Sequence, residues 1–187
     1  MPGEPDAVQL WDAATGQDVR RWSGPSGQVL ALAVASDRAH VAGATSDRGV
    51  VIWNAATGEE RAVLKSTPKR ERAEIVAYAP NGRWLAAGYS GKSEIRLWDA
   101  GTLVSKAGFA GLCRQFRSVV FSPDGRWLAA GTQDGTLFLW RLDDGVELLS
   151  RRVDIRSVRL LAFTADSRTL TVVGESGVFQ QWATAPE

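Results

Sequence analysis

The sequence predicts an all-β fold built from repeated units of four short antiparallel strands. Tryptophan recurs at a nearly constant interval, each of these tryptophans closes a short apolar run, and a turn-forming segment follows. The intervals are 42, 45, 42 and 42 residues, between Trp11, Trp53, Trp98, Trp140 and Trp182. Self-similarity at a fixed period of this size is the signature of a repeat architecture.

Composition limits the class of protein further. The chain has 187 residues, 44% of them apolar, which is enough for a packed core. Its formal net charge is +1, so no overall field attracts it to nucleic acid or to a membrane. A single cysteine excludes an internal disulfide, and no apolar run is long enough to span a bilayer. The first residues lack the pattern of a secretory signal, so we expect a cytoplasmic protein; the excess of arginine over lysine favours a bacterial source.

The first strand of each unit is expected to run into a tight hairpin turn. Pro80-Asn81-Gly82 and Pro123-Asp124-Gly125 have the proline that presets one dihedral angle and the glycine that supplies a positive φ. The corresponding segments 36–38 and 165–168 lack this pair and give a weaker signal. The expected first strands are Val29–Ala35, Ile75–Ala79, Ser118–Ser122 and Leu160–Thr164.

The remaining three strands of each unit follow the hairpin turn. One comes directly after the turn, one ends in the recurring tryptophan, and one follows an Ala-Thr-Gly type of turn. The first three are apolar on both faces, as in residues 127–130, so each sheet must be covered on both sides. The fourth strand, such as residues 147–152, is more polar and suits an outer rim. Small four-stranded sheets stacked face to face around an axis satisfy this pattern, and that arrangement is a β-propeller.

The residues that close these units resemble those of the WD-repeat propellers. Trp11-Asp12 and Trp98-Asp99 match the dipeptide after which the family is named, whereas Trp53-Asn54, Trp140-Arg141 and Trp182-Ala183 depart from it. The resemblance extends over residues 6 to 183. It implies antiparallel four-stranded blades, about four in number, forming a partial propeller or half of a larger ring.

The resemblance also implies a buried hydrogen-bond network that this chain carries only in part. In the family an Asp in the turn between second and third strands meets a His from a Gly-His pair, a Ser or Thr, and the Trp. Asp47 and Asp134 match that Asp, and Lys92 and Ser176 stand at the same offset in the other units. No Gly-His pair is present. The blades are therefore expected to depend on packing more than on this network.

The whole chain is expected to be one propeller domain whose first and last blades are incomplete. We expect the last strands of a preceding blade in residues 1–27, repeats in residues 28–66, 67–111 and 112–153, and an incomplete repeat in residues 154–187. An open arc of this kind exposes apolar faces and strand edges. Three arrangements would cover them: further repeats of a longer chain, a homodimeric eight-bladed ring, or a closed four-bladed ring.

No residues with a pattern suited to catalysis or metal binding emerge. His40 and Cys113 could suggest a base and a nucleophile, but the expected strands place them at opposite rims, roughly 17–20 Å apart. One His and one Cys cannot form a zinc site of the usual ligand types, and no phosphate-binding glycine loop is present. We therefore expect no cofactor and no metal. Trp84 and Trp127 lie within apolar strands, which favours packing over ligand stacking.

One local charge bias suggests a partner-binding surface. The segment from Lys65 to Arg72 is long, basic and irregular, and the expected topology places it on the same rim as Arg48 and Arg156. Three interpretations stay open: a solvated loop, a surface for an acidic or phosphorylated peptide, and a contact to nucleic-acid phosphate. The candidate partner-binding residues are Lys69, Arg70, Arg72, Tyr89, Lys92, Arg114, Phe116 and Arg117.

The resemblance implies a function of the scaffold type. WD-repeat propellers present a rim to partner proteins without catalysis, so we expect a non-catalytic interaction scaffold with protein partners. The alternative is a sensor or regulatory segment of a larger multidomain enzyme. Carboxylates or histidines converging on the axis would favour the enzyme, whereas the first strands supply mostly Ala, Val, Leu and Phe.

Overall fold

A computed structural model describes residues 7–23, 28–65, 72–89, 94–110, 115–143, 145 and 147–183. Within these residues the chain forms seventeen strands and no helix. The strands are β1 (Ala7–Trp11), β2 (Asp18–Ser23), β3 (Val29–Val34), β4 (His40–Thr45), β5 (Gly49–Asn54), β6 (Glu60–Leu64), β7 (Ala73–Tyr78), β8 (Trp84–Tyr89), β9 (Glu94–Asp99), β10 (Ser105–Ala110), β11 (Phe116–Phe121), β12 (Trp127–Thr132), β13 (Thr136–Arg141), β14 (Glu147–Arg152), β15 (Val158–Phe163), β16 (Thr169–Gly174) and β17 (Phe179–Ala183).

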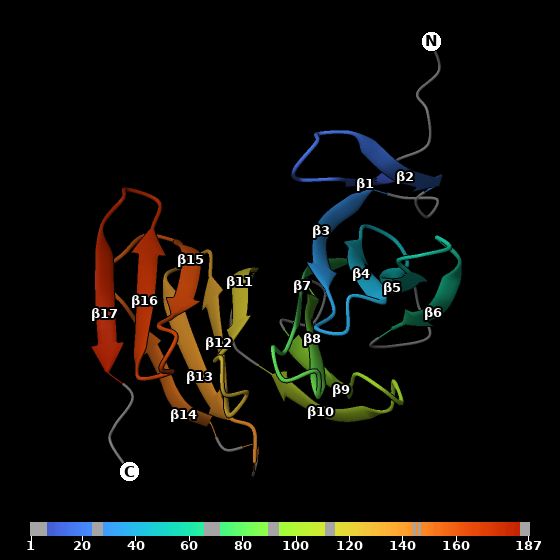
Figure 1. The fold of residues 1–187 in the computed structure, drawn as a ribbon. Helices are drawn as coiled ribbons and strands as arrows, with labels where there is room; N and C mark the ends of the chain where they lie inside the picture. The colour runs from blue at the N-terminus through green and yellow to red at the C-terminus, as the bar shows by residue number, and fades with distance from the viewer. Residues whose placement is uncertain are drawn as a thin grey trace.

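These strands form antiparallel sheets in which neighbours along the chain are neighbours in space. Three sheets have four strands each, β3 to β6, β7 to β10 and β11 to β14. A two-stranded sheet, β1–β2, precedes them and a three-stranded sheet, β15–β17, follows. The first strands β3, β7, β11 and β15 contact one another in turn, and the sheets are arranged around them as an open arc (Figure 1). This confirms the expected all-β propeller architecture with four-stranded blades.

The core lies between the blades. Four buried apolar clusters in the described residues fill the four junctions between successive sheets. Trp53, Trp98 and Trp140 end third strands and are almost fully buried there, as their position in the repeat predicts. Trp182 is only partly buried because no further sheet covers the last one. The first strands β7, β11 and β15 begin two residues earlier than the sequence suggested.

Tight turns join the first and second strands of each blade, including the two for which the sequence signal was weak. Gly82 and Gly125 have φ of 74° and 71°, in the left-handed region that glycine adopts readily. Arg38 and Ser167 occupy the same position of the turn with φ of 57° and 61°. In each turn this residue donates its backbone N–H to the carbonyl three residues earlier. Packing of the blades therefore imposes the turn where the residue type disfavours it.

The residue after the tryptophan stabilises the turn that leads to the fourth strand. Oδ1 of Asp12 accepts hydrogen bonds from the backbone N–H groups of the second and third residues after it, at 2.9 and 2.7 Å. Asn54 makes the same pair of contacts at 2.8 and 3.0 Å, and Asp99 accepts from the backbone N–H of Thr102 at 2.9 Å. These hydrogen bonds explain Asp or Asn at this position, since both residues cap turns in this way.

The Asp between second and third strands is bonded differently in two blades. Thr132 donates its hydroxyl to Oδ1 of Asp134 at 2.5 Å, and this hydrogen bond lowers the pKa of Asp134 below its usual 3.8. In contrast, Oδ1 of Asp47 is buried without a hydrogen-bond partner among the residues that the structure describes. The family network is therefore only partly formed, in agreement with the missing Gly-His pairs.

The two ends of the arc remain separate. β2 pairs with β1 and β17 pairs with β16, and the two end sheets do not pair with each other. A closed four-bladed ring, one of the three expected arrangements, is thus not formed. Apolar side chains are exposed at both ends: Leu32 and Val34 beside the short first sheet, and Leu160 and Phe179 on the last. Across the described ranges we find no helix that could span a membrane.

Candidate partner-binding site

A β-bulge recurs near the start of every first strand. Pairing with the second strand skips one residue in β3, β7, β11 and β15, and the skipped residues are Leu30, Glu74, Arg117 and Arg159. A bulge inserts one unpaired residue and redirects its side chain. Because the first strands contact one another around the axis, these four positions lie together at one end of the axis.

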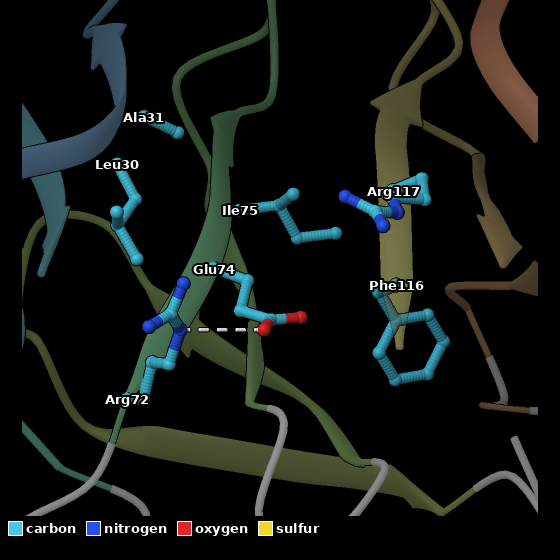
Figure 2. Close-up of a pocket in the computed structure, with 7 residues that line it drawn as sticks. All are labelled: Leu30, Ala31, Arg72, Glu74, Ile75, Phe116 and Arg117. Atoms are coloured by element: carbon cyan, nitrogen blue, oxygen red, sulfur yellow. Dashed lines mark ion pairs between the residues drawn. The ribbon is translucent and has the colours of Figure 1, made fainter. Parts of the chain in front are cut away.

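A pocket of about 360 Å³ lies at this end of the axis, between β3, β7 and β11. We call it the axial pocket. Figure 2 shows its lining, with Glu74 extending from β7 toward β11 and the Phe116 ring and Arg117 opposite. The seven lining residues are Leu30, Ala31, Arg72, Glu74, Ile75, Phe116 and Arg117.

The axial pocket has an apolar wall and carries more positive than negative charge. Nε of Arg72 lies 3.4 Å from Oε1 of Glu74, so this arginine is already paired. Arg117 is exposed and forms no ion pair or hydrogen bond within the described part of the chain. Two arginines and one glutamate leave one unit of positive charge, carried by a guanidinium whose donors are not taken up by any described residue. A carboxylate or phosphate suits that donor geometry.

The positive charge of the next bulge residue along the arc is neutralised. Arg159 forms an ion pair and a hydrogen bond with Glu175, and this contact lowers the pKa of Glu175 below its usual 4.5. Arg117 and Arg156 also lower the pKa of Glu175, more weakly, which places both near that carboxylate. Arg48, on the same rim, is held by Glu60 through two hydrogen bonds of 2.8 and 2.9 Å. Among these cations Arg117 is the one best placed to meet a ligand in the pocket.

Several residues of the sequence-based candidate set occupy other surroundings. Tyr89 is only 1% exposed and donates its hydroxyl to the backbone carbonyl of Leu64 at 3.1 Å, so it belongs to the core. Phe116 is 2% exposed and its ring packs edge-on against Phe138, so it forms part of the pocket wall and not an exposed aromatic face. Arg72 and Arg117 do line one pocket. Lys69, Arg70, Lys92 and Arg114 lie outside the described residues.

His40 lies at the other end of the first strands, among polar contacts. Its Nδ1 is 3.0 Å from Oδ2 of Asp37, and its Nε2 is 3.0 Å from Nη1 of Arg61. A guanidinium only donates, so Nε2 of His40 accepts a hydrogen bond from Arg61. The ring proton is then on Nδ1, which donates a hydrogen bond to Asp37. Both nitrogens of the neutral ring are therefore occupied. Cys113 lies outside the described residues, and those residues contain no cluster of His, Cys, Asp and Glu that could hold a metal.

Three residues of the bulge positions were missed from the sequence: Leu30, Glu74 and Arg159. A signal for them exists. Each bulge residue stands five positions before the residue that opens the hairpin turn, namely Ala35, Ala79, Ser122 and Thr164. Aligning the repeats by column would have brought Leu30, Glu74, Arg117 and Arg159 together. The net charge of a loop carries no such information, because it does not distinguish paired from unpaired cations.

Comparisons with known proteins agree with this architecture. The family model "WD domain, G-beta repeat" matches residues 16–54, 75–99 and 113–141. The chain is 29% identical over 150 residues to Autophagy-related protein 16 of Arabidopsis thaliana, over 79% of this chain and 28% of that protein. It superposes with a TM-score of 0.76 and 18% identity on the β-propeller domain of Cps50 (Swd1) from Myceliophteria thermophila, covering 96% of this chain and 59% of that one.

The chain therefore spans less than a third of its plant relative and about three fifths of the solved propeller. The matched segments each end on the recurring tryptophan and the residue after it. WD40 propeller proteins generally act as protein-interaction scaffolds. On its repeats and its sheets, the chain carries WD40 repeats and has the architecture of a WD-repeat β-propeller.

Proposed function

We propose that this chain is a non-catalytic protein-interaction module that binds an acidic or phosphorylated segment of a partner protein in the axial pocket. The observation that carries the proposal is Arg117, an exposed arginine without an ion pair in the described residues, beside an apolar wall. Phe116 and Ile75 supply that wall. A ligand residue with a short apolar stem and a terminal anion matches both features.

The charge pattern favours a single anionic group over a polyanion. Glu74 lies within the axial pocket and would repel a continuous phosphate backbone. It also holds Arg72 in place, so that Arg72 can assist with its remaining donors. A bidentate contact from Arg117 to one carboxylate or phosphate avoids the repulsion and uses the planar fork of the guanidinium. This supports a peptide ligand over nucleic acid.

The open ends of the arc support a second part of the same proposal. Leu32 and Val34 at one end and Leu160 and Phe179 at the other are exposed, although equivalent faces inside the arc are covered by the neighbouring sheet. We propose that further blades of the propeller type, from a longer chain or a second copy, cover these faces. The axial pocket would then face a complete rim.

Fluorescence anisotropy on the purified chain tests the partner-binding proposal. The probes are labelled heptapeptides that share one leucine-containing sequence and carry phosphoserine, aspartate or serine at the centre. We expect the two anionic peptides to bind more tightly than the serine peptide. Arg117→Glu should weaken their binding roughly ten- to hundredfold, because hydrogen bonds to charged groups contribute about 1.5–3 kcal/mol.

Two further variants make the result specific. Arg20→Glu changes the same charge on the exposed fourth strand β2 and should leave binding unchanged. Glu74→Gln should tighten binding, since it removes the anion beside the ligand. Equal binding of the three peptides, or identical losses in the Arg117 and Arg20 variants, would show that the axial pocket is not the binding site.

A further inference from the structure

A second pocket lies between the sheets β3–β6 and β7–β10, at the opposite end of the first strands from the axial pocket. We call it the junction pocket; its volume is about 280 Å³. The hairpin turn after β3 forms one wall with Ala35 and Asp37. The end of β7 and the turn after β9 form the other wall with Tyr78 and Ala100. The pocket thus belongs to a blade junction.

The repeat explains why this junction is hollow. His40 is the first residue of β4, and the first residues of β8 and β12 are Trp84 and Trp127. Trp84 is buried in the cluster that fills the next junction. At the equivalent place His40 presents a single small ring where the next two blades present an indole. The junction pocket is therefore located where the next two blades hold a tryptophan side chain, whereas the last blade has Thr169 at this position.

The polar groups of the junction pocket are nearly all paired. Arg61, the bulged residue of β6, donates to Nε2 of His40 and to the backbone carbonyl of Gly101 in the next blade, each at 3.0 Å. The Nδ1–H of His40 is taken by Asp37. What remains is acceptor capacity on the Asp37 carboxylate, whose side chain is 54% exposed at the mouth, and the hydroxyls of Ser36 and Tyr78.

The Tyr78 hydroxyl makes no hydrogen bond to any described residue. Burial raises the pKa of Tyr78 to about 12, so the hydroxyl stays neutral at physiological pH. The junction pocket therefore offers a mainly apolar space with the neutral hydroxyl of Tyr78 inside, and with the Asp37 carboxylate and the exposed Ser36 hydroxyl at its mouth. Its best ligand is a flat apolar ring with a single hydrogen-bond donor at its edge.

We propose that the junction pocket binds a tryptophan side chain of a partner protein, with the indole N–H donating to the carboxylate of Asp37. The volume is adequate, since an apolar cavity of about 150 Å³ already binds benzene. An aromatic anchor in a preformed pocket is also a common centre of binding energy at protein interfaces. This site is independent of the axial pocket and of the anion that we propose to bind there.

The chain contains a single histidine, which makes the test site-specific. In protein labelled with ¹³C at histidine, the imidazole Cε1–Hε1 resonance reports His40 alone. The probe is N-acetyl-tryptophanamide, and N-acetyl-leucinamide is the non-aromatic comparison. We expect a saturable shift with the indole, with a Kd on the order of millimolar, and at least fivefold weaker binding of the leucine compound.

Variants then distinguish the pocket from a surface effect. His40→Trp should fill the space and abolish binding, measured by saturation transfer to the probe. Asp37→Ala keeps the space and should weaken binding roughly three- to tenfold, because the indole loses its acceptor. The contacts of Asp37 with His40 and with the Ala39 backbone N–H are lost as well. Asp37→Ala also provides the test if His40→Trp does not fold. Arg20→Glu, on a distant strand, should bind as the unaltered chain does.

The proposal is overturned by any of four outcomes. The His40 resonance could shift equally with the leucine compound, or not shift with the indole. A folded His40→Trp variant could retain binding. Asp37→Ala could bind the indole as tightly as the unaltered chain. Circular dichroism of each variant establishes that the strands are intact before binding is compared.

Discussion

The ring of Phe109 stacks on the ring of Trp140 across a blade junction, with centroids 5.0 Å apart and planes inclined by 30°. Phe109 lies on the fourth strand of one blade and Trp140 on the third strand of the next. On β2 and β6 the same position holds Trp22 and Leu64, which belong to the clusters around the tryptophans of their next blades. The outer strand thus tethers each blade to its successor.

Phe109→Ala should therefore destabilise the fold markedly. Removal of a buried phenylalanine costs about 3–5 kcal/mol, since the apolar contact is lost and a cavity remains. Urea unfolding followed by circular dichroism measures the change. Leu148→Ala, on the fourth strand of the following blade, is the control, because Leu148 is largely exposed and its truncation should cost much less. Equal losses for the two variants would contradict this account of the junction.

Arg38→Gly should stabilise the chain. Arg38 is exposed and has a φ of 57°, which strains any residue with a side chain, whereas glycine adopts it freely. After subtraction of the greater chain entropy of glycine in the unfolded state, we expect a gain of about 0.5–1 kcal/mol in thermal or urea unfolding. The converse change, Gly125→Ala, should destabilise the chain, since Gly125 has a φ of 71°. A loss of stability in Arg38→Gly would mean that the turn is not strained.

Acid should destabilise the fold through carboxylates that accept hydrogen bonds. The pKa of Asp134 is lowered below 3.8, chiefly by the Thr132 hydroxyl. A lowered pKa in the folded state means that the contribution is fully present above pH 3.8 and disappears as the pH falls through the lowered value. Unfolding free energies should thus be nearly constant from about pH 7 to pH 5 and fall below about pH 4. In Asp134→Asn the fall should be shallower; an unchanged slope would argue against this hydrogen bond.

Alkaline pH should lower the free energy of unfolding through ionisation of Tyr78. Burial raises the pKa of Tyr78 to about 12 from its usual 10, so the folded state resists its ionisation. The associated stability is present below pH 10 and is lost as the pH rises toward 12. Tyr78→Phe should remove this alkaline loss, as measured by unfolding between about pH 9 and pH 12. Tyrosinate absorbance near pH 10 from Tyr78 in the folded chain would contradict its burial.

The chain by itself should associate in solution through the ends of the arc. Leu160 and Phe179 are more than half exposed on the last sheet, and exposed apolar sheet faces promote association. Light scattering should show species larger than the 20.2 kDa monomer. Substituting both residues with lysine should reduce association, whereas Val104→Lys, at an exposed turn within the arc, should not. A compact, soluble monomer of the unaltered chain would refute the prediction.

The blades and their core follow from the sequence because their signals are local. The spacing of the tryptophans, the two-sided apolar runs and the proline-glycine turns each depend on a few adjacent residues. The turns at Arg38 and Ser167 carry no such signal and still form. Their geometry is imposed by sheets that pack on either side, which is a tertiary effect that overrides local preference.

The sites depend on pairing between strands, and local pattern describes pairing poorly. The bulges that aim Glu74 and Arg117 into the axial pocket are shifts of register, visible only when two strands are placed together. Tyr89 and Phe116 border basic segments in the sequence, yet both lie in the core, because Tyr89 ends β8 and Phe116 begins β11 at a blade junction. The junction pocket likewise becomes evident only when His40 is aligned with Trp84 and Trp127, which hold the same position in the next two blades.

The bulge in each first strand has a consequence for how such a protein can change. Its residue is skipped by the ladder, so Leu30, Glu74 and Arg117 can differ in charge and size while the same sheets form around them. Each of these blades therefore contributes one side chain to the ligand-binding surface, and that side chain can vary nearly independently of the others. Single substitutions at these positions can therefore change which ligand is bound while the core between the blades stays the same.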